Sequence, residues 1–232
     1  MNITLTSVKA LDSGNEVCLS LEISDGTHVE KRDLIILTDQ YYSLGIGKGG
    51  ISEEAFEELE RSAAVCSAYK KGLFMLGYGS CSASRLKYKL RGKGFDAESA
   101  EQAAMLLGRN GYIDEERDAV REAEKCSEKL WGRQRIISRL YSLGYSHRAI
   151  SAANEMLDGI DFTQKCVCLI ENNYPELTKA DTREAVEKAF SALMRMGYTS
   201  SEIREAVRTG QDFGGMVPEP VGDYMIRHKL YL

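Results

Sequence analysis

Proline, histidine and long apolar runs are scarce in this chain of 232 residues, and the scarcity excludes several classes of protein. No stretch approaches the about 18 consecutive apolar residues that a membrane-spanning helix needs. The first residues, MNITLTSVKALD, do not place an apolar stretch behind a basic one, as a secretory signal does. The sequence therefore predicts a cytoplasmic protein with no membrane partner.

The six cysteines are scattered along the chain, and none forms a CxxC pair. Because they fall in otherwise helical patterns and a chain of this length needs no disulfide staples, we expect reduced and mostly buried thiols. Cys166 and Cys168 could bind a metal, but the three histidines lie far from them in sequence. No metal site and no other cofactor is predicted.

Catalytic motifs are also missing. The chain has no nucleophile elbow, no HExxH helix and no paired-cysteine metal signature. We expect the acids of residues 114–118 in the first turn of a helix, where they interact favourably with the helix dipole. His147 is expected at an exposed helix start. The prediction is a protein without enzyme activity.

The glycine-rich segment Gly45–Gly50 invites comparison with a phosphate-binding loop. Its lysine is followed by Gly49 rather than by the serine or threonine that this loop requires. We therefore interpret the segment as a flexible linker.

Charge is distributed unevenly along the chain. The net charge of −5 divides into −8 for residues 1–60, +7 for residues 61–150 and −4 for residues 151–232. A basic middle between acidic ends suggests that a polyanionic partner binds the middle only. The alternative is the ordinary variation of surface charge along any chain.

The start of the chain has strand character. Three runs rich in β-branched residues, ITLTSVKAL, EVCLSLEI and THVEKRDLIIL, predict strands, and Asp25-Gly26 between the last two is a hairpin-turn signal. Such an antiparallel sheet is too small to be stable alone. From Ser52 onward, helix-favouring residues predominate, and all three prolines lie in the last third, so the middle can form continuous helix.

An internal repeat is the most informative feature of the sequence. Gly94-Phe95, Gly144-Tyr145 and Gly197-Tyr198 are spaced by 50 and 53 residues. Each glycine has an apolar residue four positions before it (Leu90, Leu140 and Leu193) and another eight positions before it (Leu86, Ile136 and Ala189). A helix-capping residue stands two positions after each glycine (Asp96, Ser146 and Thr199), and an alanine stands nine positions after it (Ala103, Ala153 and Ala206). This pattern predicts a helix that ends at a left-handed glycine, followed by a second, capped helix.

The repeat period leaves room for a third helix in each unit, with candidates at 53–73, 114–130 and 162–172. The predicted fold class is mostly α: about three tandem three-helix repeats in an elongated, curved array, preceded by a small antiparallel β-sheet. The predicted segments are the β segment with its linker at 1–50, repeats at 51–109, 110–158 and 159–210, and a C-terminal tail at 211–232.

Parts of the repeats resemble the RecX family. Ser82–Phe95 carries the family's serine, its two leucines four residues apart and its closing Lys-Gly-aromatic, and Gly111–Ala119 is similar to the family's Gly-Tyr-Ile-Asp segment. A second copy of the leucine motif is matched by Gly132, Arg135, Ile136, Leu140 and Gly144. The strong resemblance covers residues 80–157. Arg85 and Arg139 stand where the family often has glutamate, so this surface is more basic than the family pattern.

The resemblance implies a non-enzymatic regulator in DNA repair and homologous recombination. Such a protein binds the RecA–DNA filament and inhibits or modulates ATP hydrolysis, strand exchange and the SOS response. The expected partners are the RecA filament and single- or double-stranded DNA, and we expect a monomer. A helical-repeat protein that binds nucleic acid independently of RecA is the alternative, and a scaffold with an apolar groove is a third possibility.

Two basic stretches supply all of the candidate contact residues except Arg117, which lies between them. The full candidate set is Arg85, Lys87, Lys89, Arg91, Lys93, Arg117, Lys129, Arg133, Arg135 and Arg139. Like charges four residues apart disfavour an isolated helix, and an anionic partner would explain why they occur here. The alternative is a solvated helix face whose charges are neutralised by acids of a neighbouring helix. Trp131, the single tryptophan, either packs between repeats or stacks on a base or in a partner pocket.

Overall fold

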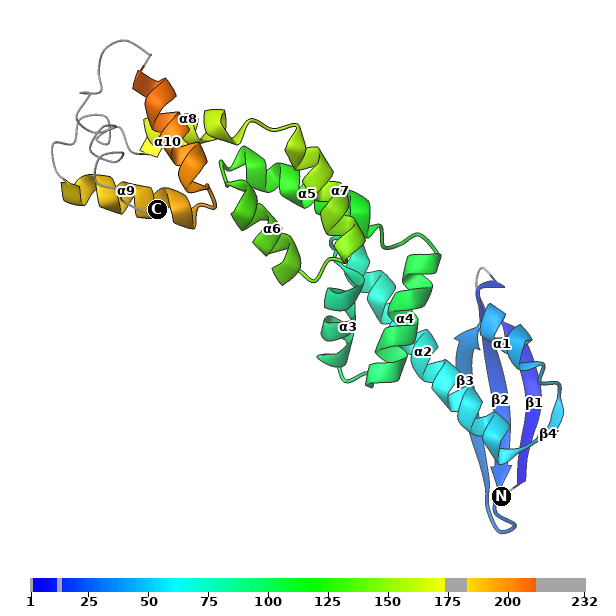
Figure 1. Ribbon diagram of the computed structural model, residues 1–232. Helices are drawn as coiled ribbons and strands as arrows, with labels where there is room; N and C mark the ends of the chain where they lie inside the picture. The colour runs from blue at the N-terminus through cyan, green and yellow to red at the C-terminus, as the bar shows by residue number, and fades with distance from the viewer. Residues whose placement is uncertain (1, 12–13, 174–182, 212–232) are drawn as a thin grey trace. The chain divides into compact units, whose positions relative to one another are not determined.

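Three strands open the chain, as the sequence predicts, and the described residues from Glu53 onward form helices and their connections (Figure 1). The computed structural model describes residues 2–11, 14–173 and 183–211. The chain divides into two units, Met1–Asp114 and Glu115–Leu232. The first contains the sheet and a helical part, and the described residues of the second are helical.

The sheet is antiparallel, with the strand order β3-β2-β1-β4. Its strands are β1 (Asn2–Ala10), β2 (Glu16–Ser24), β3 (Val29–Leu37) and β4 (Gly49–Ile51). The predicted hairpin turn lies between β2 and β3, where the Asp25 carboxylate accepts hydrogen bonds from the backbone N–H groups of Thr27 and His28. Gly26 takes the left-handed conformation (φ 94°) that favours glycine at a turn.

The predicted flexible linker at Gly45–Gly50 is wrong. A helix, α1 (Thr38–Leu44), precedes this segment and ends at Gly45, and Gly49 and Ile51 pair with β1 as the edge strand β4. The sequence of β4 lacks the alternating apolar pattern that predicts a strand, because two of its three residues are glycine. The open edge of β1 supplies the pairing partner that the local sequence does not show.

One long helix, α2 (Glu53–Gly77), contributes buried residues to two hydrophobic cores in the first unit. Ser52 begins it by accepting a hydrogen bond from the backbone N–H of Ala55 at 3.2 Å. Phe56 and Leu59, in its first half, are buried against the sheet, and Ala68, further along, is buried with residues of the following helices. The sheet is therefore stabilised by an apolar helix face that lies outside the predicted β segment.

The remaining helices follow in the predicted three-helix order, which confirms the fold class. They are α3 (Ala83–Arg91), α4 (Ala97–Arg109), α5 (Glu115–Glu128), α6 (Arg133–Ser142), α7 (His147–Asp158), α8 (Phe162–Asn173), α9 (Arg183–Arg195) and α10 (Ser200–Gln211). None of the helices in the described part of the chain is long and apolar enough to cross a membrane.

The repeated glycine motif has the predicted structure in all three copies. Gly94, Gly144 and Gly197 have φ values of 95°, 74° and 94°. The aromatic residue after each glycine donates its backbone N–H to the carbonyl of the leucine five residues earlier, at 3.3 to 3.4 Å. This bond satisfies one of the carbonyls left open at a helix end. The repeated leucines and alanines are all buried.

Close backbone contact joins the second and third repeats inside the second unit. The N–H of Gly132 donates to the carbonyl of Met196 at 2.8 Å, and that of Gln134 to the carbonyl of Gly197 at 3.2 Å. A Cβ on Gly132 would lie 2.3 Å from the backbone of Gly197. Only glycine allows this approach, so the two repeats share one core.

Candidate partner and nucleic-acid interface

Helix α3 presents the first basic stretch because its leucines fix which face points inward. Ser82 caps the helix by accepting the backbone N–H of Arg85 at 3.2 Å. Leu86 and Leu90, four residues apart, are fully buried against α4 and α2. Of the residues between them, Tyr88 is therefore exposed, and Lys87 and Lys89 are half-buried.

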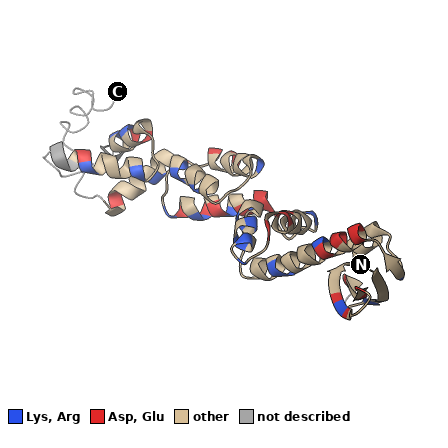
Figure 2. Cartoon of the chain, turned by 90° about the horizontal axis from the view of Figure 1, so that it is seen from below, with Lys and Arg blue, Asp and Glu red and all other residues tan. Residues whose placement is uncertain are grey.

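Four of the five cations in this stretch have no ion-pair partner among the described residues. Lys87 pairs with Glu101 of α4 at 2.8 Å, so neutralisation by a neighbouring helix applies to this residue. Arg85, Arg91 and Lys93 are exposed and Lys89 is half-buried. We call Arg85, Lys89, Arg91 and Lys93 the α3 cations. Figure 2 shows their wider setting: the acids of α2 lie in its first half, and basic residues follow in its second half.

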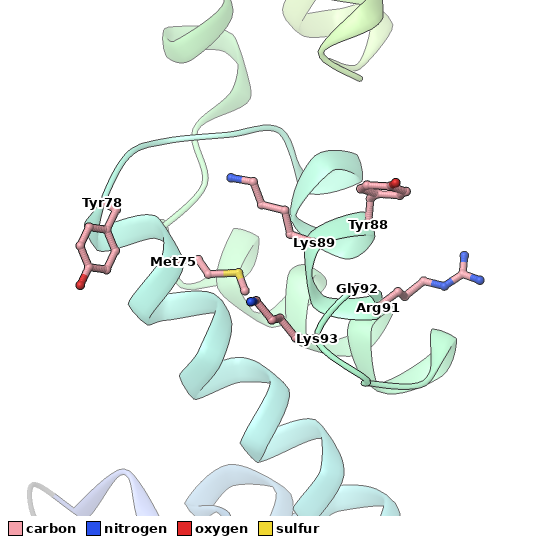
Figure 3. Close-up of a pocket in the computed structure, with 7 residues that line it drawn as sticks. All are labelled: Met75, Tyr78, Tyr88, Lys89, Arg91, Gly92 and Lys93. Atoms are coloured by element: carbon pink, nitrogen blue, oxygen red, sulfur yellow. The ribbon is translucent and has the colours of Figure 1, made fainter.

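A pocket of about 610 Å³ lies between the end of α2 and α3 (Figure 3). It is lined by Met75, Tyr78, Tyr88, Lys89, Arg91, Gly92 and Lys93, which include no acid. Lys89 and Lys93 extend from α3 toward the end of α2, where Met75 and Tyr78 lie. Tyr88 and Arg91 project together on the other side of α3. The pocket combines positive charge with aromatic and thioether surface.

The two tyrosines of this pocket are unusually open to solvent. Tyr78 is 82% exposed and Tyr88 is 79% exposed, the highest values among the exposed large hydrophobic side chains of the described residues. Exposed aromatic rings beside unpaired cations are typical of surfaces that bind single-stranded nucleic acid or a partner protein.

Helix α6 carries the second basic stretch, and its cations are engaged inside the second unit. Arg133 pairs with Asp158 and lies over the Phe162 ring at 5.7 Å. Arg139 pairs with Glu122 at 3.5 Å. These two candidate contact residues therefore connect α6 to neighbouring helices of their own unit.

Arg135 of α6 lies over the ring of Trp131, 3.9 Å from its centroid. Its guanidinium also donates to the sulfur of Met196 at 2.8 Å. Trp131 is half-buried and packs against the main core of the second unit, so the interpretation of this tryptophan as a packing residue is confirmed. The face of the ring that a base would need is partly covered by Arg135.

The last two candidates lie near α5 in the second unit. Arg117 is exposed in α5, and Lys129 is exposed in the turn between α5 and α6. Their role in binding remains a prediction, as does that of the other candidates. His147 is exposed as the first residue of α7, as expected.

The cysteines are free thiols, and four of them are buried. Burial raises the pKa of Cys66 to about 11 and that of Cys166 to about 12. These thiols therefore stay protonated at neutral pH and are weak nucleophiles and metal ligands. Within the residues that the structure describes, no group of three His, Cys, Asp or Glu side chains is arranged to hold a metal ion.

Known proteins are similar to this chain in both sequence and fold. The regulatory protein RecX of Xanthomonas campestris pv. campestris (strain B100) is 29% identical over 127 residues, which cover 55% of this chain and 77% of that protein. The regulatory protein RecX of Pelodictyon phaeoclathratiforme (strain DSM 5477 / BU-1) is 29% identical over 137 residues, or 59% and 84% of the two chains.

Solved structures agree with these sequence matches. A crystal structure of a regulatory protein RecX superposes with a TM-score of 0.69 at 17% identity and covers 90% of this chain and 99% of its own. The chain is therefore similar to RecX proteins in both sequence and fold. The structure of RecX from Lactobacillus salivarius, with a TM-score of 0.56 at 16% identity, covers 65% of this chain and 98% of its own. No family model matches the chain.

The pocket between α2 and α3 contains residues that the sequence did not predict as contacts. Met75, Tyr78 and Tyr88 were not among the candidate contact residues. Tyr88 stands between two lysines of the basic stretch, and this interleaving of rings and cations was an available signal. Tyr78 follows the last residue of α2 and gave no such signal, because only the fold brings it to the wall of the pocket.

Proposed function

We propose that this chain regulates the RecA recombinase by binding the RecA–DNA filament through the α3 cations. One observation carries the proposal: four cations on one short segment lack ion-pair partners among the described residues, in a chain that is similar to RecX proteins. The relatives are named regulatory proteins, so the expected effect is modulation of RecA rather than catalysis. ATP hydrolysis and strand exchange by the filament are the expected targets, and through them DNA repair and the SOS response.

The physical argument concerns charge. Arg85 and Lys89 lie four residues apart on α3, where like charges repel by tenths of a kcal/mol, and Lys93 adds a further cation in the turn after the helix. A polyanionic filament relieves this repulsion and attracts the surface over a distance of about 10 Å at moderate salt. Binding should therefore weaken as salt is raised.

The test is DNA-dependent ATP hydrolysis by RecA of the same organism, titrated with this protein at two salt concentrations. We expect the ATPase rate to change at sub-equimolar protein and the effect to shrink at higher salt. An unchanged rate at equimolar protein, with helical circular dichroism intact, would contradict the proposal.

A matched pair of triple variants locates the effect. Arg85→Glu, Lys89→Glu and Lys93→Glu together should abolish the effect on ATPase. The control, Lys9→Glu, Lys48→Glu and Arg109→Glu, changes the net charge equally at exposed positions outside α3 and the pocket and should retain the effect. Equal loss in both triples would show that overall charge, and not the α3 surface, is responsible.

A RecA-independent nucleic-acid-binding protein is the second candidate. The exposed Tyr78 and Tyr88 beside unpaired cations favour it, because such a surface can bind a strand without a protein partner. Salt-dependent DNA binding together with an unchanged RecA ATPase would support this function over the first.

A further inference from the structure

The turn that follows α3 has the same backbone hydrogen bonds as the turn that follows α9. Gly94 and Gly197 are both left-handed, and the N–H of each donates to the carbonyl three residues earlier at 3.0 Å. Phe95 and Tyr198, the next residues, each donate an N–H to a leucine carbonyl five residues earlier. The two turns are therefore similar in shape, and what binds one of them shows what can bind the other.

The turn after α9 is occupied by the start of helix α6. The carbonyls of Met196 and Gly197 accept the backbone N–H groups of Gly132 and Gln134 at 2.8 and 3.2 Å. A helix start leaves such N–H groups without partners inside the helix, so the turn satisfies them. A Cβ on Gly132 would lie 2.3 Å from Gly197, so the incoming helix must begin with glycine. Tyr198 is fully buried in this contact.

The turn after α3 holds no such helix start among the described residues. Lys93 and Gly94, which match Met196 and Gly197 in position, are exposed, and no described residue donates to their carbonyls. A Cβ on Gly94 would meet nothing within 4 Å. Phe95, the counterpart of the buried tyrosine, is only half-buried. The acceptors, the open space and the ring that bind a helix start in the second unit are therefore all available here.

A second pocket, of about 410 Å³, lies beside this turn in the first unit. Phe95 lines it together with Ile35 of β3 and Phe74 of α2, and Phe74 is 57% exposed. Its lining contains two lysines and no acid. Lys70 is ion-paired with an acid of β2, whereas Lys71 lies over the Phe74 ring and has no ion-pair partner among the described residues. A segment bound here meets apolar surface and an unpaired cation.

One difference between the two turns determines the charge of the occupant. In the second unit, Arg135 of the incoming helix donates to the sulfur of Met196 at 2.8 Å. Lys93 stands at that position in the first repeat, where it would repel an arginine and attract a carboxylate. We propose that the turn from Lys93 to Phe95, with the pocket beside it, binds the start of a partner protein's helix that has glycine first and an acid three residues later. This site goes beyond the proposed function, because it needs neither DNA nor RecA.

The experiment uses the chain's own helix start as the probe. A labelled peptide of residues 127–142, which contains Gly132 and α6, is titrated with the full chain and followed by fluorescence anisotropy. The Arg135→Glu peptide should bind about threefold tighter than the unsubstituted peptide, because it offers Lys93 a counter-charge. The Arg139→Glu peptide has the same net charge at a position away from the turn, so it should gain little. A Gly132→Val peptide should not bind.

Variants of the full chain complete the test. Lys93→Glu should reverse the preference between the two peptides, whereas Lys48→Glu, at an exposed position outside the pocket, should keep it. Phe74→Ala should weaken binding about threefold or more, and Tyr42→Ala, which removes a ring that is 75% exposed elsewhere, should not.

Three results would overturn the proposal. The first is no binding of the Arg135→Glu peptide at millimolar concentration, and the second is a peptide preference that Lys93→Glu leaves unchanged. The third is dimerisation of the chain alone that Phe74→Ala abolishes in sedimentation, which would assign the site to a second copy of the chain.

Discussion

Helices α3 and α6 occupy the same place in successive repeats, yet they use their cations differently. Lys89 and Arg139 each lie five residues before the glycine of their repeat. Arg85 and Arg135 each lie nine residues before it. On α3 these side chains have no ion-pair partner among the described residues, whereas on α6 they contact Glu122, Trp131 and Met196. Equivalent basic residues can therefore be unpaired in one repeat and contribute to the fold in the next.

The difference arises from what lies next to each helix in its own unit. Gly197 and Met196 of the third repeat come within hydrogen-bond distance of the start of α6, which brings partners to Arg135. Beside α3, α4 supplies Glu101 to Lys87, and the end of α2 contributes Met75 and Tyr78 but no acid to the pocket. A cation stays unpaired where the neighbouring elements provide no counter-charge.

Substitution of the repeat glycines should show the largest contrast. Gly94 and Gly197 both have left-handed φ, so alanine costs about 1–2 kcal/mol of folding stability at either position. A Cβ on Gly197 would also meet Arg135 at 2.5 Å, whereas one on Gly94 meets nothing within 4 Å. We expect Gly197→Ala to cost about 2–5 kcal/mol in total, since overpacking adds about 1–3 kcal/mol.

Urea unfolding measures this contrast with two probes. Fluorescence of Trp131, the single tryptophan, reports the second unit, and far-ultraviolet circular dichroism reports all helices. Similar losses for Gly94→Ala and Gly197→Ala would mean that the close approach of the second and third repeats contributes little to stability.

Removing an arginine should separate structural from partner-directed cations. Arg135→Ala loses the contact with Trp131 and Met196 and should destabilise the second unit by about 1–2 kcal/mol. Arg91→Ala, on the exposed side of α3, should change stability by less than about 0.5 kcal/mol. Thermal unfolding followed by tryptophan fluorescence and by circular dichroism compares the two, and a stable Arg135→Ala protein would remove the distinction between α6 and α3.

The helix caps offer the smallest contrast, and it depends on pH. Asp96 caps α4 in the first repeat, and Ser146 caps α7 in the second. Replacing either by alanine should cost about 1 kcal/mol at neutral pH. Hydrogen bonds from Ser99 hold the pKa of Asp96 below its ordinary value. Its contribution is therefore fully present above the unfolded-state pKa and is lost as pH falls through the lower folded-state pKa.

The expected pH effect is specific to the aspartate. The cost of Asp96→Ala should shrink between about pH 7 and pH 3, while the cost of Ser146→Ala should stay constant, because serine does not titrate. Urea unfolding at the two pH values measures both, and Asp96→Asn, which keeps a capping oxygen without the charge, is the control. A pH-independent cost for Asp96→Ala would mean that the hydrogen bonds do not favour the ionised form.

Local chemistry made much of this fold predictable. The positions of Gly94, Gly144 and Gly197 relative to buried leucines determined where helices end, because the left-handed conformation and the apolar stripe are properties of a few neighbouring residues. The capping residues and the Asp25-Gly26 turn were predictable for the same reason. Strand β4 was not, since a Gly-Gly-Ile segment acquires its conformation from the edge of β1.

The candidate site was predictable only as a list of charges. The sequence by itself determined that α3 would be basic outside and apolar inside, through the spacing of Leu86 and Leu90. Only the tertiary structure decided which cations are paired, that Arg135 covers Trp131, and that Tyr78 meets the α3 cations in one pocket. The physical reason is that ion pairs, ring contacts and pockets join residues that are distant in the chain. A helical pattern in the sequence shows on which face of the helix a residue lies, but it does not show which residues of other elements pack against that face.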